Sequence, residues 1–438
     1  MDRRSRITRR QFLIGGGIVT SGLLIGHMQR VIGYAVRPSA NAPVVSARVY
    51  CPLIIVDKQG TPAATPSATV TPSATATPSP TVTPSSTATP SPTATSVPLL
   101  RGHVVHTYHP RATSWDFARG WYGDSVDARI VADMVDEGVT RLTRTTTRAD
   151  AWAALLPNYQ PGQMIGIKVS LNNAAREDDD NEIDALMDPI NAIIRGLLEI
   201  GVPEQNIWIF DVTHGDHPGI IPLRFKRRCA YPQVKFASYQ DEHPELGFSA
   251  IEKVRFNTPP DIAPLPDLPF CNALVNVHYL INMPIMKRHV GAGISLGFKN
   301  HFGSIDRCNL LHRYTDIGAD YFSDRYSPLV DINGHPQIRQ KTILTIGDGL
   351  FGNPVNNISA PSRWRTFGNT APNSLFFSRD PVAIDCVMAD FLRTESGETP
   401  GADFYLRLAS AAGLGVYERG DPWGRGYNLI VYERVNLS

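Results

Sequence analysis

The sequence predicts an α/β domain with a mostly parallel sheet flanked by helices, preceded by a disordered stalk. From about residue 99 onward, short apolar runs alternate with stretches of helical periodicity, the pattern of strand–helix–strand units. Before that point, residues 61–98 contain only Thr, Pro, Ser, Ala and Val. Such a segment has no pattern that could build a core, and its repeated prolines favour an extended, disordered chain.

Composition divides the chain into four parts. We expect a signal or N-terminal anchor over residues 1–42, a short apolar segment over 43–60, the Pro/Thr/Ser-rich disordered linker over 61–98, and the α/β domain over 99–438. The linker would act as a spacer, or simply as an inert connection, between the N-terminus and the domain.

The N-terminus carries an export motif. The run Thr8-Arg9-Arg10-Gln11-Phe12-Leu13 resembles the twin-arginine signal and precedes a glycine-softened apolar stretch. That stretch is shorter than the roughly 20 apolar residues of a spanning helix. We therefore expect the twin-arginine translocase as a partner and an extracytoplasmic location, secreted or associated with the cell envelope. Contact with a membrane is expected only through an uncleaved signal.

Within the domain, buried-type apolar runs predict strands and amphipathic runs predict helices. Ile190, Ile193 and Leu197 share one helical face, and Gly201 follows as a stop signal. Pro381 opens a second apolar run, as the first turn of a helix allows. In chain order we expect strands over 104–107, 165–169, 207–210, 273–282, 343–346, 375–377 and 429–432, and helices over 125–139, 184–199 and 381–392.

Charge and cysteine content exclude several classes of function. The formal net charge is +1, and we find no basic stripe with interleaved aromatic residues, so nucleic acid is not an expected partner. The five cysteines show no C-x-x-C spacing. No cysteine-ligated iron–sulfur cluster is therefore expected.

Two glycine motifs resemble catalytic loops but lack the required context. Residues 347–352 have the G-x-G-x-x-G spacing, yet Asn353 and Pro354 follow where a dinucleotide site needs a helix. Residues 293–297 have the G-x-S-x-G spacing, yet polar residues precede them where a nucleophile elbow needs a buried strand. We expect neither a dinucleotide site nor a serine hydrolase.

Polar side chains follow several of the expected strands. In parallel sheets, ligands bind beyond the carboxyl ends of the strands, so these groups define the candidate site. Their cations, amides and imidazole suit a carboxylate or phosphate group. The candidate catalytic residues are Lys287, His289 and Lys299, and the candidate substrate-binding residues are Lys168, Asn172, Asn300 and Arg379.

Individual roles follow from the residue types. His289 could act as a general acid or base, with its pKa set by the neighbouring cations. Asp380 and Asp385 could balance charge, but caps and anchors of the helix at 381–392 are the favoured interpretation. A second cluster could hold a transition metal, or could consist of ordinary turn residues: His214, Asp216 and His217, with Asp348 as a further ligand.

These motifs together resemble the DUF362 family. Residues 282–289 run into residues 293–303, and this segment is similar to the family's central signature. Residues 167–172, 346–349 and 378–385 resemble its other motifs, in the same order. The resemblance covers most of residues 160–395. Several members carry a ferredoxin-like cysteine module and are described as iron–sulfur proteins, but this chain lacks those cysteines.

Three functions remain open at this stage. The first is an enzyme that acts on a small anionic compound, a carboxylate or phosphate, in a pocket of Lys, His and Asn. The second is a cofactor- or metal-binding protein linked to redox chemistry, which export in the folded state would suit. The third is a cell-surface binding module at the end of the linker.

Overall fold

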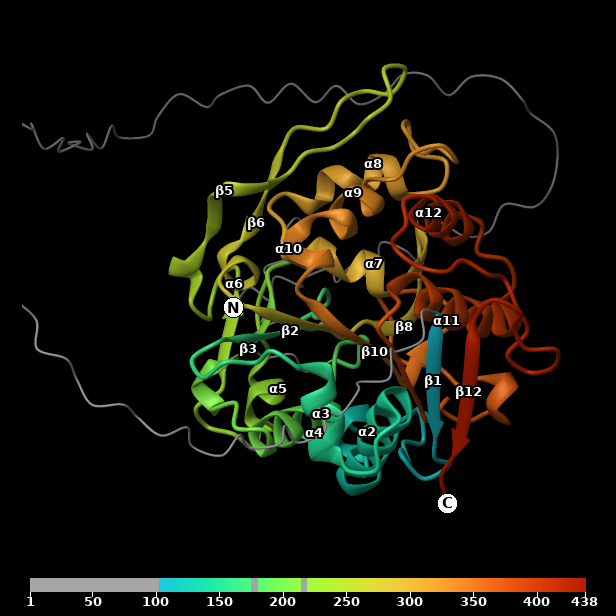
Figure 1. The fold of residues 1–438 in the computed structure, drawn as a ribbon. Coiled ribbons are helices and arrows are strands. Elements are labelled where there is room, and N and C mark those ends of the chain that lie inside the picture. Colours follow the sequence, from blue (N-terminus) through green and yellow to red (C-terminus); the bar gives the residue numbers. More distant parts are fainter. Residues whose placement is uncertain (1–101, 175–179, 214–218) are drawn as a thin grey trace, which may run out of the picture. The chain divides into compact units, whose positions relative to one another are not determined.

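A mixed ten-stranded sheet forms the centre of the domain (Figure 1). The computed structural model describes residues 102–174, 180–213 and 219–438, so the predictions made for the signal, the apolar segment and the linker lie outside the described residues. The main path of the sheet has the order β12-β1-β11-β10-β7-β2-β3-β4. Its strands are β1 (His103–Tyr108), β2 (Ile165–Lys168), β3 (Ile207–Asp211), β4 (Lys235–Ser238), β7 (Tyr279–Asn282), β10 (Thr342–Asn353), β11 (Ser374–Ser378) and β12 (Val431–Asn436).

Most neighbouring strands are parallel. β10, β7, β2, β3 and β4 form one parallel block, and β12 is parallel to β1. β11 is the exception, because it runs antiparallel to both β10 and β1. Beyond the end of β7, the long strand β10 pairs with β8 (Ile285–His289), which forms a hairpin with β9 (Gly293–Ser295).

Helices cover both faces of the sheet (Figure 1). α2, α3 and α4 enclose one apolar core, in which Met134, Ile190 and Ile193 are fully buried. α7, α9, α11 and α12 enclose the other, in which Phe298, Ile332 and Val387 are fully buried. Their bounds are α2 (Ala128–Thr143), α3 (Arg148–Leu155), α4 (Met187–Glu199), α7 (Gly297–Asn300), α9 (Pro328–Gly334), α11 (Pro381–Ser396) and α12 (Pro400–Ala411).

Short elements complete the domain. A two-stranded antiparallel sheet, β5 (Phe248–Val254) and β6 (Leu268–Cys271), stands apart from the main sheet (Figure 1). The remaining short helices are η1 (Tyr122–Ser125), η2 (Glu204–Asn206), α5 (Leu223–Arg227), η3 (Pro244–Leu246), α6 (Asn272–Val275), η4 (His301–Ser304), η5 (Cys308–Leu311), α8 (His312–Thr315), α10 (Pro336–Arg339) and η6 (Arg365–Phe367).

The observed fold confirms the predicted class and corrects some boundaries. The strand expected over 273–282 is wrong in its first half, because the Asn276 N–H bonds to the Asn272 carbonyl and closes a helical turn, α6, before β7 begins. α2 begins at Ala128, since Asp127 rather than Ser125 caps it. β10 continues as a strand to Asn353, so no helix opens after the glycine motif at 347–352. The glycine motif therefore lacks the strand-to-helix turn of a dinucleotide-binding fingerprint.

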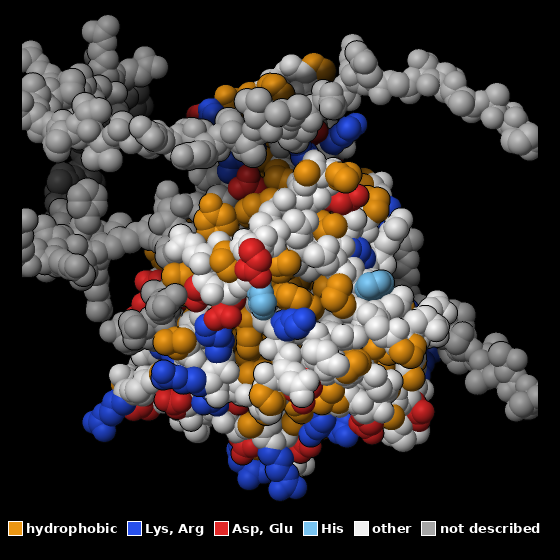
Figure 2. Space-filling model, turned by 90° about the vertical axis from the view of Figure 1, so that its left-hand side faces the viewer, with side chains coloured by type: hydrophobic (Ala, Val, Ile, Leu, Met, Phe, Trp, Pro, Cys, Tyr) orange, Lys and Arg blue, Asp and Glu red, His pale blue; other side chains and the backbone are white. Residues whose placement is uncertain are grey.

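The surface shows no field of one sign on the face in Figure 2, where basic and acidic side chains are interspersed. This agrees with the near-zero formal net charge. Among the described residues, we find no helix with the length and apolar character to cross a membrane.

Candidate functional site

Buried polar groups meet where β2 and β3 end. The Lys168 Nζ lies 3.3 Å from the Asp211 Oδ2 and donates to the Val169 carbonyl and, at 3.3 Å, to the Asn300 Oδ1. Both members of this ion pair are almost completely buried. Burial lowers the pKa of Lys168, and the Asp211 carboxylate opposes that shift. Lys168 thus has an ion-pair partner and two hydrogen-bond acceptors. The ion pair links the end of β2 to the end of β3.

The backbone at Gly303 packs closely against this ion pair. The Gly303 carbonyl accepts a hydrogen bond from the Val212 N–H. A Cβ atom on Gly303 would lie 2.0 Å from the Asp211 Oδ1 and 2.7 Å from the Lys168 Nζ. Only glycine therefore allows the backbone to approach the pair this closely.

Asp385 of α11 sets the position of α7. Its two carboxylate oxygens accept the N–H groups of Gly297 and Phe298 at 2.8 and 3.0 Å. Burial raises the pKa of Asp385 to about 7, against these two hydrogen bonds. Asp380 caps α11 by accepting the N–H groups of Val382 and Ala383. Both aspartates have the anchoring roles favoured from the sequence.

Lys287 of β8 is paired with neutral oxygens. Its Nζ donates to the Asn172 Oδ1 at 2.6 Å and to the Ile183 carbonyl at 3.4 Å, and the side chain is fully buried. Burial lowers its pKa, with the Asp184 carboxylate acting in the opposite direction. The structure thus joins two of the residues that the sequence placed in one site.

Lys299 of α7 is the exception among the three buried lysines. Its side chain is only 6% exposed. Its Nζ lies 3.5 Å from the centroid of the Phe302 ring, a cation–π contact, and has no hydrogen bond or ion pair with any described residue. Burial lowers the pKa of Lys299 to about 7, although the nearby Asp316 carboxylate acts to raise it. A buried ammonium with so few partners is costly to keep charged.

His289 is held in one tautomer by two backbone hydrogen bonds. Its Nδ1 accepts the N–H groups of Gly291 and Ala292, both at 3.0 Å, so the proton of the neutral ring resides on Nε2. Burial, followed by the charge of Lys299, holds the pKa of His289 far below its ordinary value. His289 is therefore a neutral hydrogen-bond donor at physiological pH.

A histidine–aspartate pair lies against His289. The ring of His312 stacks on that of His289 with centroids 5.4 Å apart, and its Nδ1 is 3.0 Å from both carboxylate oxygens of Asp316. Burial acts to raise the pKa of Asp316, but the hydrogen bond and charge of His312, together with Lys299 and Thr315, lower it by more, so the pKa is lowered. The ionised carboxylate holds the proton on Nδ1, which leaves the Nε2 of His312 as a base. We call Lys299, Phe302, His289, His312 and Asp316 the Lys299 cluster.

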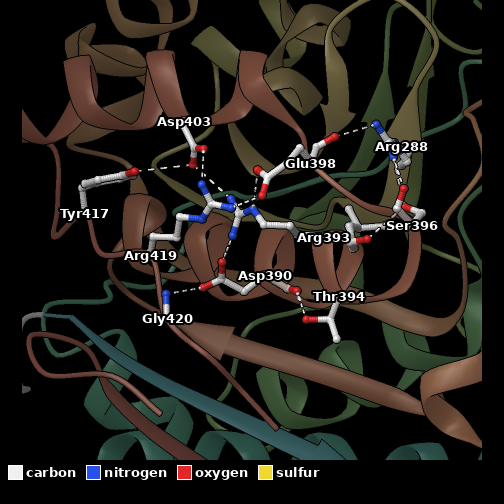
Figure 3. A network of polar contacts seen from close by, with 11 residues as sticks. Arg288, Asp390, Arg393, Thr394, Ser396, Glu398, Asp403, Tyr417, Arg419 and Gly420 are labelled. Atoms are coloured by element: carbon white, nitrogen blue, oxygen red, sulfur yellow. Dashed lines mark hydrogen bonds and ion pairs between the residues drawn. The ribbon is translucent and has the colours of Figure 1, made fainter. Parts of the chain in front are cut away.

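β8, the strand that ends at His289, is anchored through Arg288 (Figure 3). Arg288 donates to the carbonyls of Ser396 and Glu398, just beyond the buried part of α11. There Arg393 pairs with Asp390, Glu398 and Asp403, and Arg419 pairs with Glu398 and Asp403. This network joins α11, α12 and the following loop, so β8 has a rigid support.

Two predicted site residues lie elsewhere. Arg379 lines a cavity away from the Lys299 cluster, together with Thr342 from the start of β10. Asp348 is opposite Leu375, which packs in the core under α2 and α4, so it faces the other side of the sheet. Burial raises the pKa of Asp348 to about 6.

The predicted metal cluster lies outside the described residues, since these exclude His214, Asp216 and His217. The remaining predicted ligand is Asp348. Within residues 102–174, 180–213 and 219–438, neither Asp348 nor any other residue belongs to a group of three His, Cys, Asp or Glu placed to hold a metal ion. The described cysteines are Cys229, Cys271, Cys308 and Cys386, and all are free thiols.

Four residues of the site were not predicted from the sequence: Asp211, Phe302, His312 and Asp316. Asp211 directly follows the apolar run of β3, as other site residues follow theirs. The spacing of His312 and Asp316, four residues apart, was the available signal for a pair on one helical turn.

Comparisons with known proteins give one family match. Residues 187–390 match the model of a domain of unknown function (DUF362). The match contains the Lys299 cluster and agrees with the resemblance found in the sequence motifs. No curated protein matches the chain.

Among the solved structures that are similar over part of their length is the lactate racemase apoprotein from Thermoanaerobacterium thermosaccharolyticum, with 15% identity and a TM-score of 0.31. The similarity covers 52% of this chain and 51% of that one, so the chain spans about half the length of the structure it matches. We draw no argument about activity from it.

Proposed function

We propose that this protein is an enzyme that binds a small carboxylate or phosphate compound at Lys299 and transfers a proton with His312. The buried Lys299 ammonium carries this proposal, because it has neither an ion pair nor a hydrogen bond with a described residue. Leaving a cation in that state costs folding free energy. A ligand that supplies the missing negative charge recovers this free energy on binding.

The base of the proposed reaction is His312. Its partner Asp316 fixes the tautomer and stabilises the imidazolium that forms when Nε2 takes a proton. Side-chain exposure of 38% leaves His312 open to a substrate, whereas Asp316 is less exposed.

His289 and Lys299 would stabilise negative charge. The Nε2–H of His289 is a fixed donor, because two backbone N–H groups occupy its Nδ1. Two donors beside a base suit the removal of a proton from a carbon next to a carboxylate or carbonyl group, where the developing charge resides on oxygen. We infer this class of reaction, with a small carboxylate as substrate.

Deuterium exchange tests the proposal. The purified protein is incubated in D2O with a panel of small carboxylates that carry a proton on the adjacent carbon, and NMR follows the loss of that proton. We expect exchange with at least one compound. His312→Gln should lower the rate by about 100-fold or more, the loss typical of a removed general base.

Matched variants separate chemistry from folding. His243→Gln is the control, because His243 also pairs with a carboxylate, that of Glu245, but at an exposed turn. Asp316→Asn should lower the exchange rate while leaving carboxylate binding intact, whereas Lys299→Met should lower binding itself. Equal exchange rates in the parent and in His312→Gln would show that His312 is not the base, and binding unchanged in Lys299→Met would refute the anion site.

A further inference from the structure

A cavity lies on the same face of the sheet as α7, α9 and α11. Its volume is about 300 Å³. Asn282 and Thr345, which pair across β7 and β10, line it together with His301. Arg339 of α10 and Arg379, just before α11, line it as well. None of the residues of the Lys299 cluster lines this cavity.

Two deeply buried side chains point polar atoms into the cavity without protein partners. Thr345 is 1% exposed, and its hydroxyl has no hydrogen bond with any described residue. His301 is equally buried and uses Nδ1 with the Ser304 hydroxyl, so its Nε2 has no partner in the described part of the chain. Burial, with a smaller effect of Lys168, lowers the pKa of His301 to about 3, so the ring is neutral. Buried polar atoms of this kind mark a place for a ligand.

Asn333 adds an acceptor to the same lining. Its amide nitrogen donates to the carbonyls of Phe298 and Leu329, which fixes the side chain and leaves Oδ1 without a partner among the described residues. The cavity thus offers a hydroxyl, an imidazole and an amide oxygen, a set that matches the hydroxyl groups of a polyol.

The cavity also carries an unbalanced positive charge. Arg339 donates to the Gly413 carbonyl at 3.2 Å, and Arg379 has no hydrogen bond or ion pair with the described residues. No aspartate or glutamate is among the residues that line the cavity. The nearby Asp380 carboxylate accepts the backbone N–H groups of Val382, Ala383 and Val416 and caps α11.

We propose that this cavity binds a small phosphorylated polyol or sugar. Its phosphate would lie between Arg339 and Arg379, because guanidinium groups match phosphate oxygens in pairs. Its hydroxyl groups would contact Thr345, His301 and Asn333. Ile338 and Leu414 supply the apolar surface for its carbon atoms. This site is separate from the proposed proton-transfer site, and neither proposal depends on the other.

Calorimetry with defined probes tests the second site. Ribose 5-phosphate, inorganic phosphate and ribose are titrated into the purified protein. We expect the ester to bind more tightly than phosphate, and ribose alone to bind weakly. Arg379→Gln should weaken the binding of both phosphates by about tenfold or more, the effect of one charge-assisted hydrogen bond. Thr345→Val should reduce the preference for the ester over phosphate.

Two controls locate the binding. Arg255→Gln removes an arginine that is 88% exposed on the β5–β6 hairpin region and should leave binding unchanged. Lys299→Met should also leave it unchanged, since Lys299 belongs to the other site. Unaltered affinity in Arg379→Gln would overturn the proposal, as would loss of binding in Lys299→Met alone. Binding of carboxylates in place of phosphates would overturn the assignment of the ligand class.

Discussion

Replacing Lys299 by methionine should make the protein more stable at neutral pH while removing its anion site. The Lys299 side chain is 94% buried and pairs with no described carboxylate. Methionine has a similar length and volume and needs no counter-charge. The substitution therefore removes the cost of a buried charge and keeps most of the packing against Phe302.

The size of this effect follows from the pKa of Lys299. Burial lowers it from the ordinary 10.5 to about 7, and each pKa unit corresponds to about 1.4 kcal/mol. Below the folded-state pKa, Lys299 is protonated in both the folded and the unfolded protein. The free energy of unfolding is then lowered by the full cost of burying the charged ammonium, at most about 5 kcal/mol. Above it, folding releases the proton and the cost declines until the unfolded-state pKa is reached. The free energy of unfolding of the parent, compared with that of Lys299→Met, should thus rise between about pH 7 and about pH 10.5.

Urea denaturation at several pH values measures the difference between Lys299→Met and the parent. We expect the variant to be more stable by about 2 to 5 kcal/mol near pH 6 and by about 1 kcal/mol near pH 10. Lys253→Met, at an exposed position of β5, is the control and should give a small difference that does not vary with pH. If the difference for Lys299→Met were constant with pH, or if the variant were less stable throughout, Lys299 would have a partner in the folded protein and the reasoning would fail.

Three further substitutions test the supports of the site, each by urea denaturation. Lys168→Met should destabilise the protein by about 3 to 5 kcal/mol, because it leaves the buried Asp211 carboxylate unpaired, and adding Asp211→Asn should recover part of the loss. Gly303→Ala should cost about 2 kcal/mol or more, since its Cβ would clash with that ion pair, whereas Gly334→Ala, whose Cβ has ordinary contacts, should cost little. Arg393→Ala should cost about 3 kcal/mol, because it removes the centre of the network that supports β8.

The sequence was sufficient for most strands because their apolar runs are continuous and bounded by polar residues. The strands expected over 165–169 and 207–210 correspond to β2 and β3, within one residue at each end. The rule that ligands bind beyond the carboxyl ends of parallel strands also led to Lys287, His289 and Lys299. It could not find α8, since a helix of four residues is too short for a periodic pattern, and His312 and Asp316 were missed with it.

The same rule misplaced Arg379 for a physical reason. It holds only when every strand runs in the same direction, and β11 runs antiparallel to β10. The last residues of β11 therefore point back toward the start of β10, and Arg379 meets Thr342 there instead of the lysines. Strand direction depends on pairing between distant segments, which local patterns do not encode.

The three buried lysines show why partners, rather than residue type, indicate function. From the sequence we predicted that all three belong to one cationic pocket. In the structure, however, Lys168 has an ion pair and Lys287 has neutral hydrogen-bond acceptors. A charge that the fold already balances contributes little to ligand binding, because an incoming anion would have to compete with the internal partner. Lys299 has a cation–π contact with Phe302 but no hydrogen bond or ion pair with a described residue, so an anion there need not displace a bonded partner. Among the three, Lys299 is therefore the residue at which binding and stability should respond in opposite directions to the same substitution.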